Sequence, residues 1–231
     1  MLELLHAGQS RKMRLLCLTF GFLSAAATCL AQPGAYENEI AAFEAADRQT
    51  PPPKGAILFM GSSSIRLWKT LAEDFPEHQV INRGFGGSQI VDNTRFIDRI
   101  AVPYLPRLIV FYCGGNDLNG GRSPEQVAAD FREFAAEIRR RLPETRLAYI
   151  SIAGNPARWG DVEKVRAANA HIAAIIAQDP KMQFVDIFPH MLGADGLPRP
   201  ELFVADKLHM SPAGYRIWAQ IVRPHLSALS K

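Results

Sequence analysis

A serine, a histidine and an aspartate in this chain have the types and the spacing that nucleophilic catalysis requires. Ser63 is the second of three consecutive serines after Gly61, and Asp206 precedes His209 by three positions. A serine hydroxyl attacks a carbonyl carbon when a base accepts its proton, and histidine serves as this base near neutral pH. A carboxylate on the other ring nitrogen holds the histidine in the correct tautomer. The pattern therefore predicts acyl transfer, with Ser63 as nucleophile, His209 as base and Asp206 as its partner.

Two further segments carry hydrogen-bond donors suited to the negative charge that this reaction develops. Residues 82–88 read Asn-Arg-Gly-Phe-Gly-Gly-Ser, and residues 114–117 read Gly-Gly-Asn-Asp. Glycine N–H groups and the amide of Asn116 stabilise an oxyanion without adding a charge. Both segments could also be plain turns, because Gly, Asn and Asp dominate turns. Asp117 is expected to brace its loop rather than to react.

Short apolar runs and helical patterns alternate along the chain, and they must position these residues. The apolar runs, which we expect to be strands, cover 56–60, 79–82, 108–113, 147–152 and 184–187. Helical patterns cover 37–49, 65–72, 90–101, a segment from 124 that ends before Pro143, 162–177 and a final segment from 212. This alternation predicts an α/β fold with a five-stranded parallel sheet covered by helices on both faces.

The candidate residues follow the predicted strands at the place where sites of such sheets form. Residues 61–64, 82–88 and 114–117 come directly after the first three apolar runs, and 206–209 precede the final helix. Loops after the carboxyl ends of parallel strands gather at one edge, so the four segments are expected to meet there. The loop at 155–159 follows the fourth run and either lines the mouth of the site or is simply solvated.

The four segments resemble the sequence blocks of the SGNH hydrolases, the GDSL-type esterases and lipases, in order and in placement. The resemblance spans Gly61 to Gly214 and is closest to the branch of platelet-activating-factor acetylhydrolase-like proteins and carbohydrate O-acetyl esterases. It implies the same catalytic residues together with two oxyanion donors: Ser63, Asp206 and His209, with Gly87 and Asn116. Ser62 departs from the family pattern, which usually has Asp there, but that Asp fills none of these roles.

The resemblance also implies a fold, a reaction and a class of substrate. The fold is a three-layer α/β/α sandwich of flavodoxin-like type with strand order 2-1-3-4-5. The reaction is hydrolysis of short-chain acyl esters, mainly acetyl esters, through an acyl-enzyme on the serine. The substrate is a small acyl ester or an acetylated glycan, and the family implies no metal and no cofactor.

The first 31 residues differ from the rest and have the pattern of a secretory signal peptide. Three basic residues between positions 11 and 14 precede a mainly apolar run over 15–30, and Ala31 leads into a polar Gln-Pro-Gly segment. The run of about 16 residues is shorter than the ~20 that a membrane-spanning helix needs, although a single membrane anchor is the alternative. The pattern predicts export to the periplasm or the medium. Lipidation at Cys29 is a weaker alternative, and translation could begin at Met1 or Met13.

Removal of this leader leaves a mature chain with a net charge near +1 and no basic stripe, so a nucleic-acid partner is not expected. The predicted organisation is a signal peptide at 1–31, an N-terminal helix and linker at 32–54, and a hydrolase domain at 55–231. Composition and spacing say nothing about the oligomeric state.

Other interpretations of the same residues stay open at this level. Ser63 could be a helix N-cap, and Asp206 with His209 could bind a metal, although no other histidine shows zinc-site spacing. Cys113 is the only cysteine after residue 31 and is expected to be a buried thiol rather than a nucleophile. Residues 61–64 could hold a phosphate on a non-catalytic ligand- or phosphate-binding module, but they lack the lysine of a P-loop.

Overall fold

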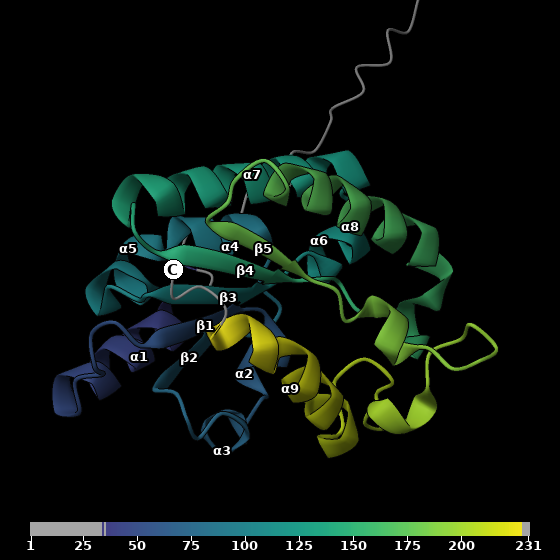
Figure 1. Cartoon of the computed structure of the whole chain (residues 1–231), viewed down its shortest axis with the longest axis horizontal. Coiled ribbons are helices and arrows are strands. Elements are labelled where there is room, and N and C mark those ends of the chain that lie inside the picture. The colour runs from purple at the N-terminus through teal and green to yellow at the C-terminus, as the bar shows by residue number, and fades with distance from the viewer. Residues whose placement is uncertain (1–33, 35, 228–231) are drawn as a thin grey trace, which may run out of the picture. The chain divides into compact units, whose positions relative to one another are not determined.

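The computed structural model describes residue 34 and residues 36–227, and a five-stranded parallel sheet lies at its centre (Figure 1). The strands are β1 Ile57–Gly61, β2 Val80–Gly84, β3 Leu108–Tyr112, β4 Arg146–Ile150 and β5 Met182–Val185. Their spatial order is β2-β1-β3-β4-β5, and every neighbouring pair is parallel. The predicted sheet and its order are confirmed, and the predicted strand limits differ from these by at most two residues.

Helices cover both faces of the sheet, which buries the central strands. Leu58 and Ile109 belong to the core cluster on one face, and Phe59 and Val110 to the cluster on the other. Figure 1 shows α7 and α8 on one side of the sheet and α9 on the other. The helices are α1 Glu37–Gln49, α2 Ser63–Arg66, α3 Leu71–Asp74, α4 Ile90–Arg95, α5 Ile97–Ile100, α6 Gly115–Asn119, α7 Pro124–Arg141, α8 Val162–Ile176 and α9 Pro212–Ser227. The predicted three-layer arrangement is confirmed.

The single helix predicted over 65–72 is wrong, because the two short helices α2 and α3 replace it. Between them, the indole of Trp68 is buried against the ring of Phe59 on β1. The Trp68 Nε1 donates a hydrogen bond of 2.6 Å to Asp74 Oδ2. Helical periodicity in the sequence does not reveal this break, because the break results from burial of the Trp68 side chain against the sheet.

The helix predicted over 90–101 is also divided, into α4 and α5, with the break at Phe96. The ring of Phe96 is buried in the core, and its backbone departs from helical geometry with φ −100° and ψ 7°. The Thr94 hydroxyl donates to the Ile90 carbonyl at 3.1 Å, a bond that often bends helices. Packing of Phe96 therefore shortens the predicted helix.

Two helices begin at a serine that caps them, at the positions where the sequence predicts their starts. The Ser123 hydroxyl accepts a hydrogen bond from the Gln126 N–H, and the Gln126 side chain accepts one from the Ser123 N–H. The Ser211 hydroxyl accepts a hydrogen bond of 3.2 Å from the Gly214 N–H at the start of α9. This second cap fixes the point at which the chain leaves the Asp206–His209 segment.

The structure tests the predicted N-terminal helix but not the predicted signal peptide. The helix expected over 37–49 is present as α1. The signal peptide predicted for 1–31 lies outside the described residues, and the predicted boundaries of 32–54 and 55–231 stay predictions. Within residue 34 and residues 36–227, no helix is both long and apolar enough to cross a membrane.

Candidate active site

The carboxyl ends of β1, β2 and β3 lie side by side, as the predicted edge site requires. In the parallel register, Gly61 pairs with Gly84 on one side and with Tyr112 on the other. Gly61 has a φ of 134°, and a Cβ there would lie 2.0 Å from the Tyr112 carbonyl oxygen. Only glycine fits this position. The chain can therefore turn sharply from β1 into α2 against its neighbouring strand.

Ser63 is the first residue of α2, directly after this turn. The N-cap position belongs to Ser62, whose side chain makes no capping hydrogen bond, so the alternative of Ser63 as the helix cap is wrong. As the first helical residue, Ser63 has a backbone N–H without an intrahelical acceptor. Its hydroxyl oxygen lies 2.8 Å from His209 Nε2, which is within hydrogen-bond reach of a base.

A short loop before α9 holds the histidine and the aspartate together. The Nδ1 of His209 lies 2.7 Å from Asp206 Oδ2. The other carboxylate oxygen accepts hydrogen bonds from the Leu208 and His209 N–H groups, both at 2.9 Å. Lys207 adopts the left-handed conformation, with φ 59°, within this tight turn. A three-residue spacing therefore brings the aspartate and the histidine into one chain of contacts that ends at Ser63.

The surroundings of Asp206 favour its ionised form. The hydrogen bond from the His209 side chain, followed by those from the backbone, lowers the pKa of Asp206 to about 2. The side chain is 48% exposed, so solvent screening limits what the pair adds to stability. Asp206 is nevertheless charged throughout the neutral pH range. A charged carboxylate beside Nδ1 can orient the imidazole and stabilise an imidazolium.

The loop after β2 leaves Gly87 exposed. Gly87 has a φ of 78°, and its N–H makes no hydrogen bond to any other described residue. The next residue, Ser88, is buried, and its hydroxyl donates to the Gly61 carbonyl at 3.3 Å and to the Phe85 carbonyl at 3.1 Å. This loop is therefore anchored to the end of β1, two residues before Ser63.

Asn116 lies in α6, which begins directly after β3. Its Nδ2 donates to the Ser88 carbonyl at 3.1 Å, which joins the two predicted donor segments. The neighbouring Asp117 is fully buried, and its Oδ1 accepts the Ile90 N–H at 3.0 Å, while Oδ2 has no partner among the described residues. Burial raises the pKa of Asp117 to about 6. Asp117 braces α6 against the start of α4, as predicted.

The N-terminal helix α1 also reaches the Gly87 loop, a contact that residue patterns did not indicate. Tyr36, immediately before α1, packs edge to face on Phe85 with 5.1 Å between ring centroids. A Cβ at Gly87 would lie 3.7 Å from the Tyr36 hydroxyl oxygen. Glu39 Oε1 accepts a hydrogen bond from the Gly86 N–H at 3.4 Å. A segment outside the predicted hydrolase domain therefore contacts one of the two donor loops.

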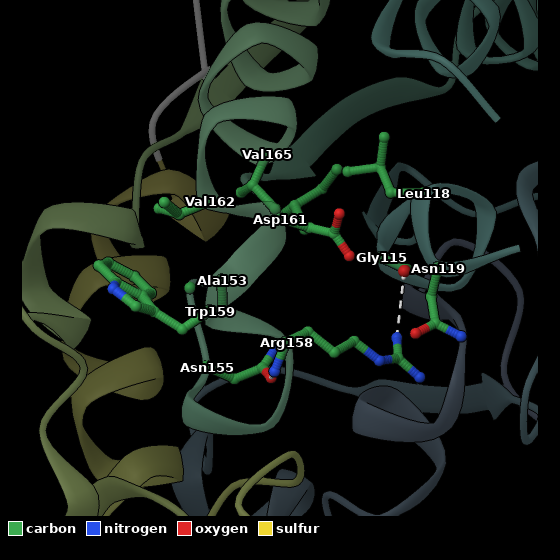
Figure 2. A pocket seen from close by; sticks show the side chains of 12 residues that line it. Gly115, Leu118, Asn119, Ala153, Asn155, Arg158, Trp159, Asp161, Val162 and Val165 are labelled. Atoms are coloured by element: carbon green, nitrogen blue, oxygen red, sulfur yellow. Dashed lines mark hydrogen bonds between the residues drawn. The ribbon is translucent and has the colours of Figure 1, made fainter. Parts of the chain in front are cut away.

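A pocket lies beside the Asn116 turn, bordered by α6 and by the loop after β4 (Figure 2). Its lining includes Gly115, Leu118, Asn119, Asn155, Arg158 and Trp159. Figure 2 shows Arg158 extended toward Gly115, whose carbonyl oxygen accepts a hydrogen bond of 3.1 Å from Arg158 Nη1. Neither Ser63 nor His209 lines this pocket, so the pocket does not contain the reacting groups.

Two of the alternative roles receive no support from the geometry. Cys113 is buried, and this burial raises the pKa of its thiol well above the ordinary value, which disfavours the nucleophilic thiolate. Its sulfur instead donates to the Ser88 carbonyl at 3.4 Å. Among the residues that the structure describes, no three or more His, Cys, Asp or Glu side chains are grouped so as to hold a metal ion.

Two polar side chains at this edge have contacts that the sequence did not reveal. Arg158 Nη1 donates to Asn116 Oδ1 at 3.1 Å. Asn82 donates to the Ile65 carbonyl at 2.7 Å and accepts the Gly84 N–H at 3.0 Å, which holds α2 against the end of β2. The only signal in the sequence was their place in the chain. Asn82 ends a predicted strand, and Arg158 lies in the loop that follows another.

Comparison with known proteins finds a matching family and proteins of similar sequence or similar fold. Residues 59–217 match the model of the GDSL-like lipase/acylhydrolase family. The chain is 26% identical over 183 residues to platelet-activating factor acetylhydrolase IB subunit alpha1 of Bos taurus, covering 74% of this chain and 73% of that protein. A GDSL-like lipase from Bacteroides thetaiotaomicron superposes with a TM-score of 0.69 at 19% identity, covering 81% of this chain and 96% of the other. A family 3 carbohydrate esterase from Clostridium thermocellum superposes with a TM-score of 0.60 at 18% identity, covering 76% and 98%.

Proposed function

Because the chain belongs to the GDSL-like lipase/acylhydrolase family and is a carboxylic ester hydrolase, we propose that it cleaves short-chain acyl esters through an acyl-enzyme on Ser63. The observation that carries this proposal is the chain of two contacts from Ser63 Oγ through His209 to Asp206, at 2.8 and 2.7 Å. A helix cap or a phosphate cradle has no need of a histidine held in this way. A serine nucleophile requires it.

The proposed reaction has two steps. Ser63 Oγ attacks the ester carbonyl carbon and passes its proton to His209 Nε2. The tetrahedral intermediate collapses, the bond to the alcohol oxygen breaks, and the alcohol leaves with the proton from His209. Water then attacks the acyl carbon while His209 accepts a proton from it. The bond between Ser63 Oγ and the acyl carbon breaks, His209 returns the proton to Ser63 Oγ, and the carboxylic acid is released. Asp206 keeps the ring oriented and stabilises its charged form in both steps.

The oxyanion formed in each step needs donors that are already in place. In the proposal, the Gly87 N–H and the Asn116 Nδ2 supply them. The Gly87 N–H has no acceptor among the residues that the structure describes, and a hydrogen bond from Asn116 to Ser88 ties Asn116 to the same loop; both observations support this assignment. Loss of one such donor in a studied protease lowers kcat by about 10²–10³.

We propose that the acyl group is short, mainly acetyl, on a small ester or a glycan. The support comes from the relatives, since one is named an acetylhydrolase and another a carbohydrate esterase. Export of the protein is part of the same proposal and rests on the basic, apolar and small-residue pattern over 1–31. Recovery from the periplasm or medium of a chain that starts at Gln32 would support export, and a chain retained in the cytoplasm with its leader would contradict it.

The three adjacent serines offer a matched test of the nucleophile. Ser63→Ala should lower kcat for p-nitrophenyl acetate by at least about 10³-fold, because no other group can form the acyl-enzyme. Ser62→Ala and Ser64→Ala remove the same atom from neighbouring positions and should leave substantial activity. Comparison of acetate, butyrate and octanoate esters tests the chain length, with acetate expected to give the highest kcat/KM. Retention of full activity in Ser63→Ala would overturn the proposal.

A further inference from the structure

The side-chain amide of Asn116 is held at both ends. Arg158 Nη1 donates to its Oδ1 at 3.1 Å, and its own Nδ2 donates to the Ser88 carbonyl at 3.1 Å. A guanidinium can only donate and a carbonyl can only accept, so these partners determine which end of the amide is which. One Nδ2 hydrogen is used by Ser88, which leaves the second for another acceptor.

Arg158 is itself fixed in place. Its backbone N–H donates to the Asn155 side chain at 3.0 Å, and its Nη1 also donates to the Gly115 carbonyl at 3.1 Å. Figure 2 shows the extended side chain reaching from the loop after β4 toward α6. Within residue 34 and residues 36–227, no carboxylate forms an ion pair with Arg158. Its positive charge is therefore directed at the Asn116 turn rather than neutralised by an acidic side chain.

The same loop also contacts the other half of the site. The Ala157 N–H donates to the Lys207 carbonyl at 3.1 Å, in the turn between Asp206 and His209. Adjacent residues of one loop therefore contact the base-carrying turn and the Asn116 amide. This arrangement is suited to set the position of an oxyanion donor relative to the base.

We propose that Arg158 is a positioning residue for the oxyanion donor Asn116, a role that rests on the mechanism proposed above. The guanidinium holds the amide so that the second Nδ2 hydrogen faces the reacting carbonyl oxygen. Its charge draws electron density toward Oδ1, which makes the Nδ2–H group a stronger donor. This interaction strengthens as the oxyanion develops, so its loss lowers kcat more than it raises KM.

Kinetics of Arg158 variants with p-nitrophenyl acetate test this role. Arg158→Met removes the guanidinium and keeps an unbranched side chain, and it should lower kcat about 10–100-fold with KM changed less than about threefold. Arg158→Lys keeps a donor and a charge and should recover part of the loss. Arg132→Met changes an exposed arginine on α7 and should be within about twofold of the unmodified enzyme. Circular dichroism and thermal unfolding establish that each variant is folded.

A double-mutant cycle with Asn116→Ala separates positioning from other effects. If Arg158 acts through Asn116, then adding Arg158→Met to the Asn116→Ala variant should lower kcat by less than about threefold. An equal fold-loss in both backgrounds, an effect confined to KM, or unchanged kcat in Arg158→Met would overturn the inference. If Arg158→Met does not fold, Arg158→Gln and Arg158→Lys carry the same cycle with the same criterion. If Ser63→Ala still hydrolyses the ester, the proposed function is overturned as well. If hydrolysis depends on Ser63 but the effects of the Arg158 and Asn116 substitutions on kcat are independent of each other, only this inference is overturned.

Discussion

Two aspartates lie at the same edge of the sheet in opposite environments. Asp117 is fully buried, one of its oxygens has no partner among the described residues, and burial raises its pKa to about 6. Asp206 is half exposed, accepts hydrogen bonds from the His209 ring and from two backbone N–H groups, and has its pKa lowered to about 2. Desolvation opposes the charge in the first case, and hydrogen bonding supports it in the second.

The two environments correspond to two roles: the buried residues keep the site in place, and the exposed loop carries the histidine and the aspartate. On the buried side, Gly61, Ser88 and Asp117 hold the nucleophile turn and the donor loops through core contacts. On the exposed side, Asp206 and His209 hold each other through a turn of four residues. Changes on the exposed side should therefore alter the rate with little effect on the fold. Changes on the buried side should alter stability and its dependence on pH.

Asp206→Asn should have the largest effect on the rate. The amide oxygen can still accept the two backbone hydrogen bonds, but its NH₂ group would face His209 Nδ1 and favour the wrong tautomer. Nε2 would then carry a proton toward Ser63 and could not act as base, so kcat should fall by about 10³–10⁴. Steady-state hydrolysis of p-nitrophenyl acetate at pH 7.5 measures this loss.

The unfolding free energy of Asp206→Asn should change little. Because the folded pKa of Asp206 is below its ordinary value, the charged form adds stability above about pH 4, and this contribution is lost as the pH falls through about 2. With the side chain half exposed, the change in unfolding free energy near neutral pH should be about 1 kcal/mol or less. A fall in kcat below tenfold, or a collapse of the fold, would contradict the separation of the two regions.

Asp117→Asn should change stability in a manner that depends on pH. The pKa of Asp117 in the folded protein, near 6, exceeds its ordinary value. Ionisation of this carboxyl therefore destabilises the fold as the pH rises from about 4 to about 6, and the full loss is present above about pH 6. The amide can still accept the Ile90 N–H without a charge. Relative to the unmodified protein, the variant should gain about 2 kcal/mol between pH 4.5 and pH 7.5. A shift of about two pKa units corresponds to about 3 kcal/mol in full, and about 1 kcal/mol of it is already present at pH 4.5.

Thermal or urea unfolding of both proteins at these two pH values measures that gain. A constant offset at both values is acceptable, because the amide introduces its own unpaired hydrogens. If the difference in unfolding free energy between the two proteins is the same at pH 4.5 and pH 7.5, Asp117 does not carry the proposed buried charge.

Much of this arrangement could be predicted from residue types and spacing. The strand ends placed the segments of Ser63 and Asn116 at one edge, and the three-residue spacing of Asp206 and His209 fits a single turn. The breaks around Trp68 and Phe96 could not be predicted, because each depends on how one ring packs against residues distant in the sequence.

Contacts between loops were equally hidden from the sequence. The bond from Arg158 to Asn116 joins residues 42 positions apart, and its formation depends on the path of an irregular loop. Tyr36 reaches the Gly87 loop only because α1 packs against the same face of the sheet as α4. Periodicity and local turn chemistry contain no information on either contact.

The most direct test of the central claim is to identify the atom that becomes acylated or phosphonylated. Treatment of the purified protein with a fluorophosphonate, followed by intact-mass measurement and peptide sequencing by mass spectrometry, locates the reactive side chain. A single adduct on Ser63 that is absent in Ser63→Ala and strongly slowed in Asp206→Asn is the predicted result. An adduct on Ser62, Ser64 or Cys113, or no adduct in a protein that still hydrolyses p-nitrophenyl acetate, would contradict the account.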